Sequence, residues 1–302
     1  MKDNHATTRL RLIMMHPVLT YYAITFGISW GGMLLVGGSN IFAGTDWQTD
    51  PLFLPAILMM LVGPPVAGIF MSVLVSGKDG LRGLLSRLLK GRVAPHWYAV
   101  ALLTAPLLQA AILVTLSQTS PIFLPAIATT ADQASLLLSG ISMGLVGGLV
   151  EEIGWTGFAI PRLTVRRSVL ATGLVVGILW GAWHLLQMLW VGSTSSEGIP
   201  LELFLPQFFF TAIAQLTAYR VLMVWVYDRV GSLLIAILMH ASYIFSTLFV
   251  LAPPTTGVPF LTYSWIFAAA LWIVVGVVRR SSLRPKGANH HDKPEDKAPI
   301  SR

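Results

Sequence analysis

The chain has 302 residues, of which 55% are hydrophobic and only 11% are charged, and it contains no cysteine. A soluble globular domain carries about 25% charged residues, so this composition excludes a soluble enzyme, and its many apolar residues exclude a disordered chain. The missing cysteines exclude a disulfide framework, a thiolate zinc site, a cysteine nucleophile and a lipidated cysteine.

Eight apolar runs are long enough to cross a bilayer as helices. A membrane helix needs about 20 apolar residues, and such runs occur at 18–36, 52–75, 97–117, 134–158, 169–190, 203–226, 231–250 and 260–278. The first run follows basic residues, as in a signal peptide, but its length and the lack of a clear cleavage site indicate a retained helix. We therefore expect an all-α, polytopic membrane protein with about eight transmembrane helices.

The basic residues predict the orientation of these helices. When the connecting segments are assigned alternately to the inside and the outside, all 20 Lys and Arg residues fall in inside segments. The outside segments carry only the acids Asp46, Asp50, Asp132, Glu197 and Glu202. Positively charged segments stay in the cytoplasm, so both termini are expected there. The net charge of +7 then reflects membrane orientation, and no nucleic-acid partner is expected.

The sequence divides into a membrane domain and a tail. Residues 1–283 are expected to form the eight-helix domain, and the polar segment 284–302 a disordered cytoplasmic tail. Within the domain, the segment 77–95 has leucines at helical spacing and a basic opposite face. It is expected either to lie on the inner membrane surface or to form an ordinary cytoplasmic helix.

Two adjacent acids, Glu151 and Glu152, lie inside an apolar run. An acid near the centre of a membrane helix costs about 2.5–3.5 kcal/mol on insertion scales, and such residues are functional candidates by default. Two histidines, His184 and His240, also lie inside apolar runs. Together with the carboxylates, they indicate one shared polar site.

Small residues accompany these polar residues on the same helix faces. At 100° per residue, Glu151 lies on a glycine face of the fourth run and His184 on a glycine face of the fifth. The rows are Gly140, Gly144, Gly147 and Gly148, then Gly173, Gly177 and Gly181, and in the seventh run Ser232, Ala236 and His240. Small residues let membrane helices approach closely, so we expect the fourth and fifth helices to pack together and bring Glu151 toward His184.

These side chains are suited to activating water inside the membrane. A carboxylate bonded to a histidine can deprotonate water, and a second histidine can donate to a developing oxyanion. Adjacent carboxylates tend not to ionise together in a low dielectric. One of the two glutamates could therefore act as a base while the other acts as an acid or a structural anchor. Alternatively, His184, His240 and Glu152 could hold a divalent metal such as zinc, although the HExxH pattern of soluble metalloproteases is absent. Either arrangement suits hydrolysis of an amide near the inner leaflet.

Three motifs, in this order, resemble those of the CPBP family of CAAX-processing and bacteriocin-processing intramembrane proteases. They are Glu151-Glu152-Ile153-Gly154-Trp155-Thr156-Gly157-Phe158 with Pro161-Arg162-Leu163, then Trp180-Gly181-Ala182-Trp183-His184, then Trp225-Val226-Tyr227-Asp228-Arg229 with Gly231-Ser232 and His240-Ala241-Ser242. The resemblance covers about 134–250. It implies an intramembrane endopeptidase in which Glu151 and His184 activate water and His240 helps to bind the oxyanion, and it leaves metal dependence open.

Three positions depart from the pattern of that family. Thr156 stands where the first motif usually ends in Arg, Trp180 replaces a common Phe, and Ile244 replaces the Asn usually found four residues after the last His. Isoleucine cannot donate a hydrogen bond, and loss of one oxyanion donor can cost about 10²–10³ in rate. The nearby hydroxyls that could substitute belong to Ser242 and Ser246. The intact Glu, Glu, His, His set favours an active or weakened protease.

The leading hypothesis is therefore an intramembrane endopeptidase in the plasma membrane, acting on a peptide or a membrane protein. A second is a non-catalytic member of the same family, a binding or immunity protein that acts by contact, as Thr156 and Ile244 would allow. A third is a proton-coupled carrier, because buried Glu and His residues suit proton relay. Carriers usually show paired broken helices in repeated halves, and this chain shows no such pairing.

Overall fold

The computed structural model describes residues 13–43, 46–193 and 200–283, and in this part of the chain it contains helices and no strand. The expected tail, 284–302, lies outside the described residues. The all-α fold is thereby confirmed for the described part. The longer helices are α2 (Pro17–Gly37), α3 (Phe53–Leu88), α4 (Pro95–Ser117), α6 (Gln133–Gly154), α8 (Val169–Trp183), α11 (Leu216–Val230), α12 (Leu233–Ile244) and α13 (Gly257–Leu283).

Shorter helical segments extend or connect these helices. They are α5 (Ala126–Thr129), α7 (Ile160–Thr164), α9 (Leu185–Ser193), α10 (Leu201–Phe208), the 3₁₀ turns Gly38–Ile41 and Pro121–Phe123, and the π-helical segments Trp155–Ala159, Phe209–Gln215 and Phe245–Val250. Among the described residues, seven continuous stretches of helix are long and apolar enough to cross a membrane. The bent pair α8 and α9, which meet at 42°, makes an eighth if it crosses as one span, so seven or eight candidate spans are found where about eight were expected.

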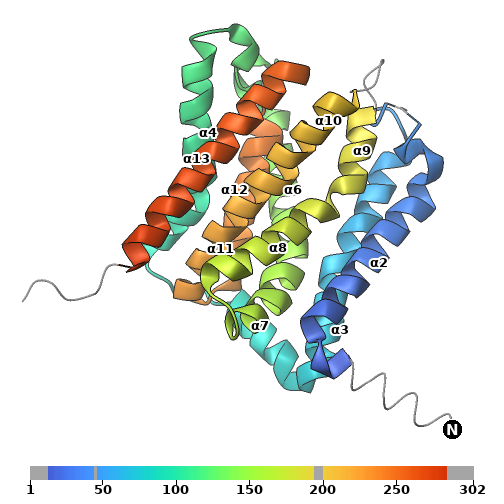
Figure 1. Cartoon of the computed structure of the whole chain (residues 1–302), viewed down its shortest axis with the longest axis vertical. Coiled ribbons are helices and arrows are strands. Elements are labelled where there is room, and N and C mark those ends of the chain that lie inside the picture. The colour runs from blue at the N-terminus through green and yellow to red at the C-terminus, as the bar shows by residue number, and fades with distance from the viewer. Residues whose placement is uncertain (1–12, 44–45, 194–199, 284–302) are drawn as a thin grey trace, which may run out of the picture.

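The helices form one bundle with the site-bearing helices in its middle. In Figure 1, α2 and α3 lie together at one side and α4 and α13 at the other, with α6, α8, α11 and α12 between them. The start of α2 and the end of α13 lie at the same end of the bundle. An even number of crossings produces this placement, although which side of the membrane that end faces stays a prediction.

Three of the central helices begin with a side chain that caps them. Asp132, Ser168 and Ser232 accept hydrogen bonds from the backbone N–H groups of Ser135, Ala171 and Ile235, at the starts of α6, α8 and α12. These bonds satisfy donors that a helix start leaves open. The hydrogen bonds that exposed Asp132 accepts from Ser135 also lower the pKa of its carboxyl group. The caps therefore set where the helices that carry the site begin.

The glycine faces pack closely, but not against each other. A Cβ atom added to Gly144 of α6 would lie 2.6 Å from the carbonyl oxygen of Ala241 in α12, and one added to Gly173 of α8 would lie 2.6 Å from Cα of Val221 in α11. Thus α6 packs on α12 and α8 packs on α11. The expected close packing of the fourth and fifth helices is wrong, because a glycine row predicts a close approach without specifying the partner helix.

The segment 77–95 is helical as far as Leu88, as its leucine spacing predicts. It continues α3 beyond a kink at Gly77, where φ is +57°. Leu84 is buried in this segment, whereas its neighbours Leu81, Leu85 and Leu89 are exposed. Arg87 donates to the carbonyl of Gly157 at 2.9 Å and to the hydroxyl of Tyr227 at 3.0 Å. These bonds hold the segment 77–95 against the π-helical segment Trp155–Ala159, which follows the two adjacent glutamates.

Candidate active site

The two glutamates lie at the end of α6, where the helix widens. Glu151 and Glu152 are buried, with only 3% and 0% of their surface exposed. The next turn, Trp155–Ala159, is π-helical. Such widened turns are frequent at functional sites. A side chain at Gly154 would collide with the hydroxyl of Tyr21 and the carbonyl of Pro64, so glycine at this position lets α6 pack against α2 and α3.

Glu151 is held through one of its two oxygens. Its Oε2 accepts hydrogen bonds from the indole N–H of Trp155 at 3.2 Å and of Trp180 at 2.7 Å. Its Oε1 has no hydrogen-bond partner among the described residues and lies 3.9 Å from Nε2 of His240. The replacement of Phe by Trp at position 180 is therefore more than a change of size, since it adds a donor to this carboxylate.

Glu152, in contrast, is bonded through both oxygens. Nη1 of Arg220 lies 2.8 Å from each of them, Nδ1 of His240 lies 2.8 Å from Oε1, and the hydroxyl of Thr156 donates to Oε2. Arg220 is itself completely buried. This carboxylate is thus an anchor that joins α6, α11 and α12.

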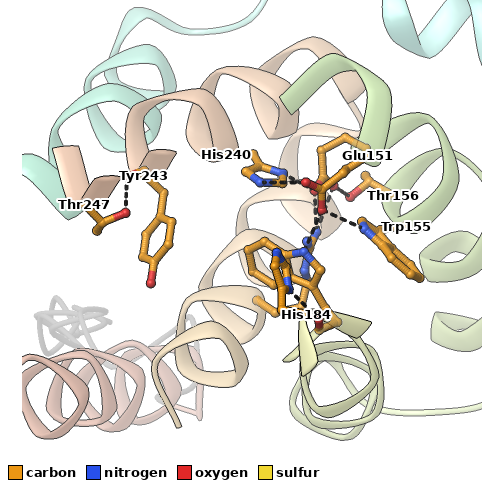
Figure 2. Close-up of polar contacts among 10 residues, drawn as sticks. Glu151, Trp155, Thr156, His184, His240, Tyr243 and Thr247 are labelled. Atoms are coloured by element: carbon orange, nitrogen blue, oxygen red, sulfur yellow. Dashed lines mark hydrogen bonds and ion pairs between the residues drawn. The ribbon is translucent and has the colours of Figure 1, made fainter. Parts of the chain in front are cut away.

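His240 connects the two carboxylates. Because a carboxylate only accepts, the 2.8 Å contact with Glu152 assigns the hydrogen atom to Nδ1. Figure 2 shows the ring directed toward Glu151 and its neighbours, whereas Tyr243 and Thr247, which follow His240 in the chain, lie apart from this group. The other ring nitrogen, Nε2, therefore faces the free oxygen of Glu151.

His184 lies at the end of α8, where the chain bends toward α9. Its Nδ1 lies 2.8 Å from the carbonyl oxygen of Trp180. A carbonyl only accepts, so Nδ1 carries the hydrogen atom and a neutral ring presents Nε2 as a base. No hydrogen bond joins His184 to Glu151 among the described residues, but both are bonded to Trp180. Trp180 thus links His184 to Glu151, and His240 links Glu151 to Glu152, so the four expected site residues lie in one region.

Arg220 is the site residue that sequence reasoning missed. Its assignment to a cytoplasmic connecting segment is wrong, because Arg220 lies in α11 with no exposed surface and pairs with Glu152. Its position inside the apolar run 203–226 is the signal that the sequence offers. Charged residues inside membrane helices usually pair with one another, and the two adjacent glutamates are the acids that the sequence places within a span.

The structure also shows where the altered third motif lies. Ile244 packs against Gly147 of α6, since a Cβ atom added there would lie 2.7 Å from Cδ1 of the isoleucine. Ser242 donates to the carbonyl of Ala101 at 2.8 Å, and Ser246 donates to that of Tyr243 at 3.2 Å. Neither hydroxyl is directed at the glutamates, so neither replaces the missing asparagine in this arrangement.

The proposed metal ligands do not fit a metal centre in this arrangement. Both oxygens of Glu152 accept hydrogen bonds from Arg220 and from either His240 or Thr156, so this carboxylate has no lone pair directed at a shared ion. Within residues 13–43, 46–193 and 200–283, no group of three His, Cys, Asp or Glu side chains is placed to hold a metal. The set of His184, His240 and Glu152 is therefore not supported as a zinc site.

Comparison with protein families gives one match over this region. Residues 133–246 match the family model described as "Type II CAAX prenyl endopeptidase Rce1-like". The matched segment extends from the start of α6 into the π-helical segment after α12 and contains both glutamates, both histidines and Arg220. A comparison with curated proteins gave no match. The family match confirms the resemblance that the three motifs indicated.

Proposed function

We propose that this protein is an intramembrane endopeptidase of the type II CAAX-processing kind, which hydrolyses a peptide bond with water activated by Glu151 and His184. The family match over 133–246 supports a CAAX-type membrane protease. The observation that carries the catalytic proposal is the difference between the two carboxylates. Both oxygens of Glu152 accept hydrogen bonds, whereas Oε1 of Glu151 accepts none from the described residues and lies 3.9 Å from Nε2 of His240.

The proposed reaction assigns one role to each group. Glu151 Oε1 accepts a proton from water, with Nε2 of His184 as a second acceptor, and the water oxygen attacks the peptide carbonyl carbon. When the ring of His240 carries hydrogen atoms on both nitrogens, its Nε2 donates to the oxyanion that forms. The proton held by Glu151 then passes to the amide nitrogen as the C–N bond breaks, and the proton left on the attacking oxygen passes to Nε2 of His184, giving a carboxylate and an amine. Glu152 holds His240 in place throughout.

The rest of the proposal concerns the setting of the reaction. The membrane domain is taken as 1–283, with its catalytic core in 134–250, in a plasma membrane with both termini in the cytoplasm. The common end of α2 and α13 in Figure 1 supports termini on one side. The bilayer and a peptide or membrane-protein substrate are the partners, and the peptide bond is cut near the inner leaflet.

Purified protein in detergent or vesicles tests this function. Hydrolysis of peptides with a prenylated or an unmodified C-terminal cysteine motif would be compared for wild type, Glu151→Gln and Glu202→Gln. The last variant is the matched control, because Glu202 is exposed and carries the same substitution. We expect cleavage by wild type and by the control and none by Glu151→Gln. Equal cleavage by all three would overturn the assignment of Glu151.

A non-catalytic role is the second candidate, and the packing of Ile244 favours it. The side chain at this position fills space against Gly147 and supplies no donor, so the site lacks one hydrogen bond that the related pattern provides. A protein that acts by contact would keep its cellular effect after Glu151→Gln. A protease would lose that effect, which separates the two candidates.

A further inference from the structure

Arg220 is a buried cation whose bonding is unequal. Its Nη1 contacts both oxygens of Glu152 at 2.8 Å, whereas its Nε and Nη2 have no hydrogen-bond partner in the described part of the chain. Leaving buried donors unpaired is unfavourable, and more so for a charged group. The charge of this side chain is therefore paired with Glu152 through Nη1 alone among the described residues.

The same guanidinium is also linked to the carboxylate of Glu151, through the ring of Trp180. Its Cζ lies 4.1 Å from the centre of the Trp180 ring, within the range of a cation–π contact. The indole N–H of Trp180 in turn donates to Oε2 of Glu151 at 2.7 Å. One side chain from α11 is therefore connected to both glutamates, to one directly and to the other through Trp180.

From these contacts we propose that Arg220 is the positioning residue of the site. It fixes the Glu152 carboxylate so that Oε1 accepts from Nδ1–H of His240, and it supports the Trp180 indole that holds Oε2 of Glu151. His240 then presents Nε2, and Glu151 presents Oε1, to the same space. The kinetic part of this inference rests on the proposed function, but the orientation of His240 does not.

This role also gives a physical account of Thr156. That residue lies one helical turn after Glu152 and donates its hydroxyl to the oxygen that Arg220 also contacts. A short side chain at 156 thus leaves the space beside Oε2 to the guanidinium from α11. The cation at this carboxylate is supplied by a different helix and not by the first motif itself.

Nitrogen-15 NMR of histidine-labelled protein in detergent tests the proposal without requiring activity. His240→Asn would assign the signals of His240. The variants would be Arg220→Met, which removes the charge, and Arg220→Lys, which keeps it. Arg82→Met is the matched control, since Arg82 is exposed and, among the described residues, pairs with nearby Asp79. If Arg220→Met does not fold, Arg220→Gln, which is neutral but can still donate to Glu152, takes its place.

We expect His240 to carry its hydrogen atom on Nδ1 in wild type, in Arg82→Met and in Arg220→Lys, and to lose this preference in the neutral variants. In the peptide assay, the neutral variants should lower kcat about 10²-fold, as a small misplacement of reacting groups can, with KM little changed. Lysine should recover about tenfold of that loss, because it restores a charge without the planar geometry of arginine.

Two results would overturn the proposal. One is a wild-type protein whose His240 lacks a hydrogen atom on Nδ1, and this result needs no variant to fold. The other is a folded neutral variant with an unchanged His240 signal. If wild type shows the expected signal and responds to Arg220 substitution but cleaves no peptide, the positioning role stands and only the proposed function fails.

Discussion

His240 donates through Nδ1 to Oε1 of Glu152 at 2.8 Å and presents Nε2 to Glu151 at 3.9 Å. The ring is therefore held at Nδ1 by Glu152, while Nε2 is directed at Glu151. A histidine oriented by a carboxylate in this way keeps one ring nitrogen available for the reacting atoms. This relationship assigns different tasks to two adjacent glutamates that look equivalent in the sequence.

Glu152→Gln should destabilise the protein far more than Glu151→Gln. The first substitution leaves the charge of Arg220 buried without its partner, and breaking a buried ion pair in this way costs about 3–5 kcal/mol. The second removes a carboxylate whose hydrogen-bond donors among the described residues are the neutral indoles of Trp155 and Trp180. Thermal unfolding of the two variants in the same detergent measures this difference. Equal loss of stability would show that Glu152 is not the anchor.

Trp180→Phe should lower the rate of hydrolysis while leaving the fold intact. Phenylalanine keeps an aromatic ring beside Arg220 but removes the N–H that donates to Glu151 at 2.7 Å. A hydrogen bond to a charged group contributes about 1.5–3 kcal/mol, so kcat should fall roughly 10- to 100-fold. Trp183→Phe is the matched control, because the indole N–H of Trp183 has no partner among the described residues. A similar rate for both variants would contradict the role given to the Trp180 donor.

Gly144→Ala should destabilise the packing of α6 on α12. The added Cβ atom would lie 2.6 Å from the carbonyl oxygen of Ala241, and overpacking of a well-packed interior typically costs about 1–3 kcal/mol. Gly276→Ala in α13 provides the comparison, because a Cβ atom there meets nothing within 4 Å. The unfolding midpoint should fall for the first variant and not for the second. An unchanged midpoint for Gly144→Ala would mean that the two helices are not in close contact.

Hydrolysis should be insensitive to metal chelators. The expectation follows from the bonding of Glu152, whose oxygens accept from protein donors and are not arranged as ligands with His184 and His240. Cleavage rates after treatment with a strong chelator should match those of untreated protein. Loss of cleavage that added zinc restores would instead support a metal site that forms by rearrangement of these residues.

The sequence predicts where the helices lie along the chain, but not which helices pack against each other. Runs of apolar residues locate the spans, because the bilayer imposes a length on every helix that crosses it. Glycine rows correctly mark close approaches at Gly144 and Gly173, yet the partner helices, α12 and α11, are not those expected. Helical periodicity assigns a residue to a face, and the choice of partner depends on how all the helices pack together.

The site is predictable only in part. Both glutamates and both histidines lie in the region expected for them, but Arg220 is missed when it is counted among the cytoplasmic cations. The widened turn at Trp155–Ala159 is also not foreseen, since a π-helical turn has no clear sequence pattern. The rule that a charged residue inside an apolar run needs a partner is enough to join Arg220 to the glutamates from the sequence alone.

Comparison of membrane-protein N- and C-termini in cells with wild type or Glu151→Gln tests the central claim most directly. Expression and membrane insertion of the two proteins would be matched, and Glu202→Gln would serve as control. Proteolysis predicts a small set of new termini that appear with wild type and with the control and disappear with Glu151→Gln, and these termini would name the substrate. Identical termini in all three, under conditions where the protein has a cellular effect, would contradict the protease assignment and favour action by contact.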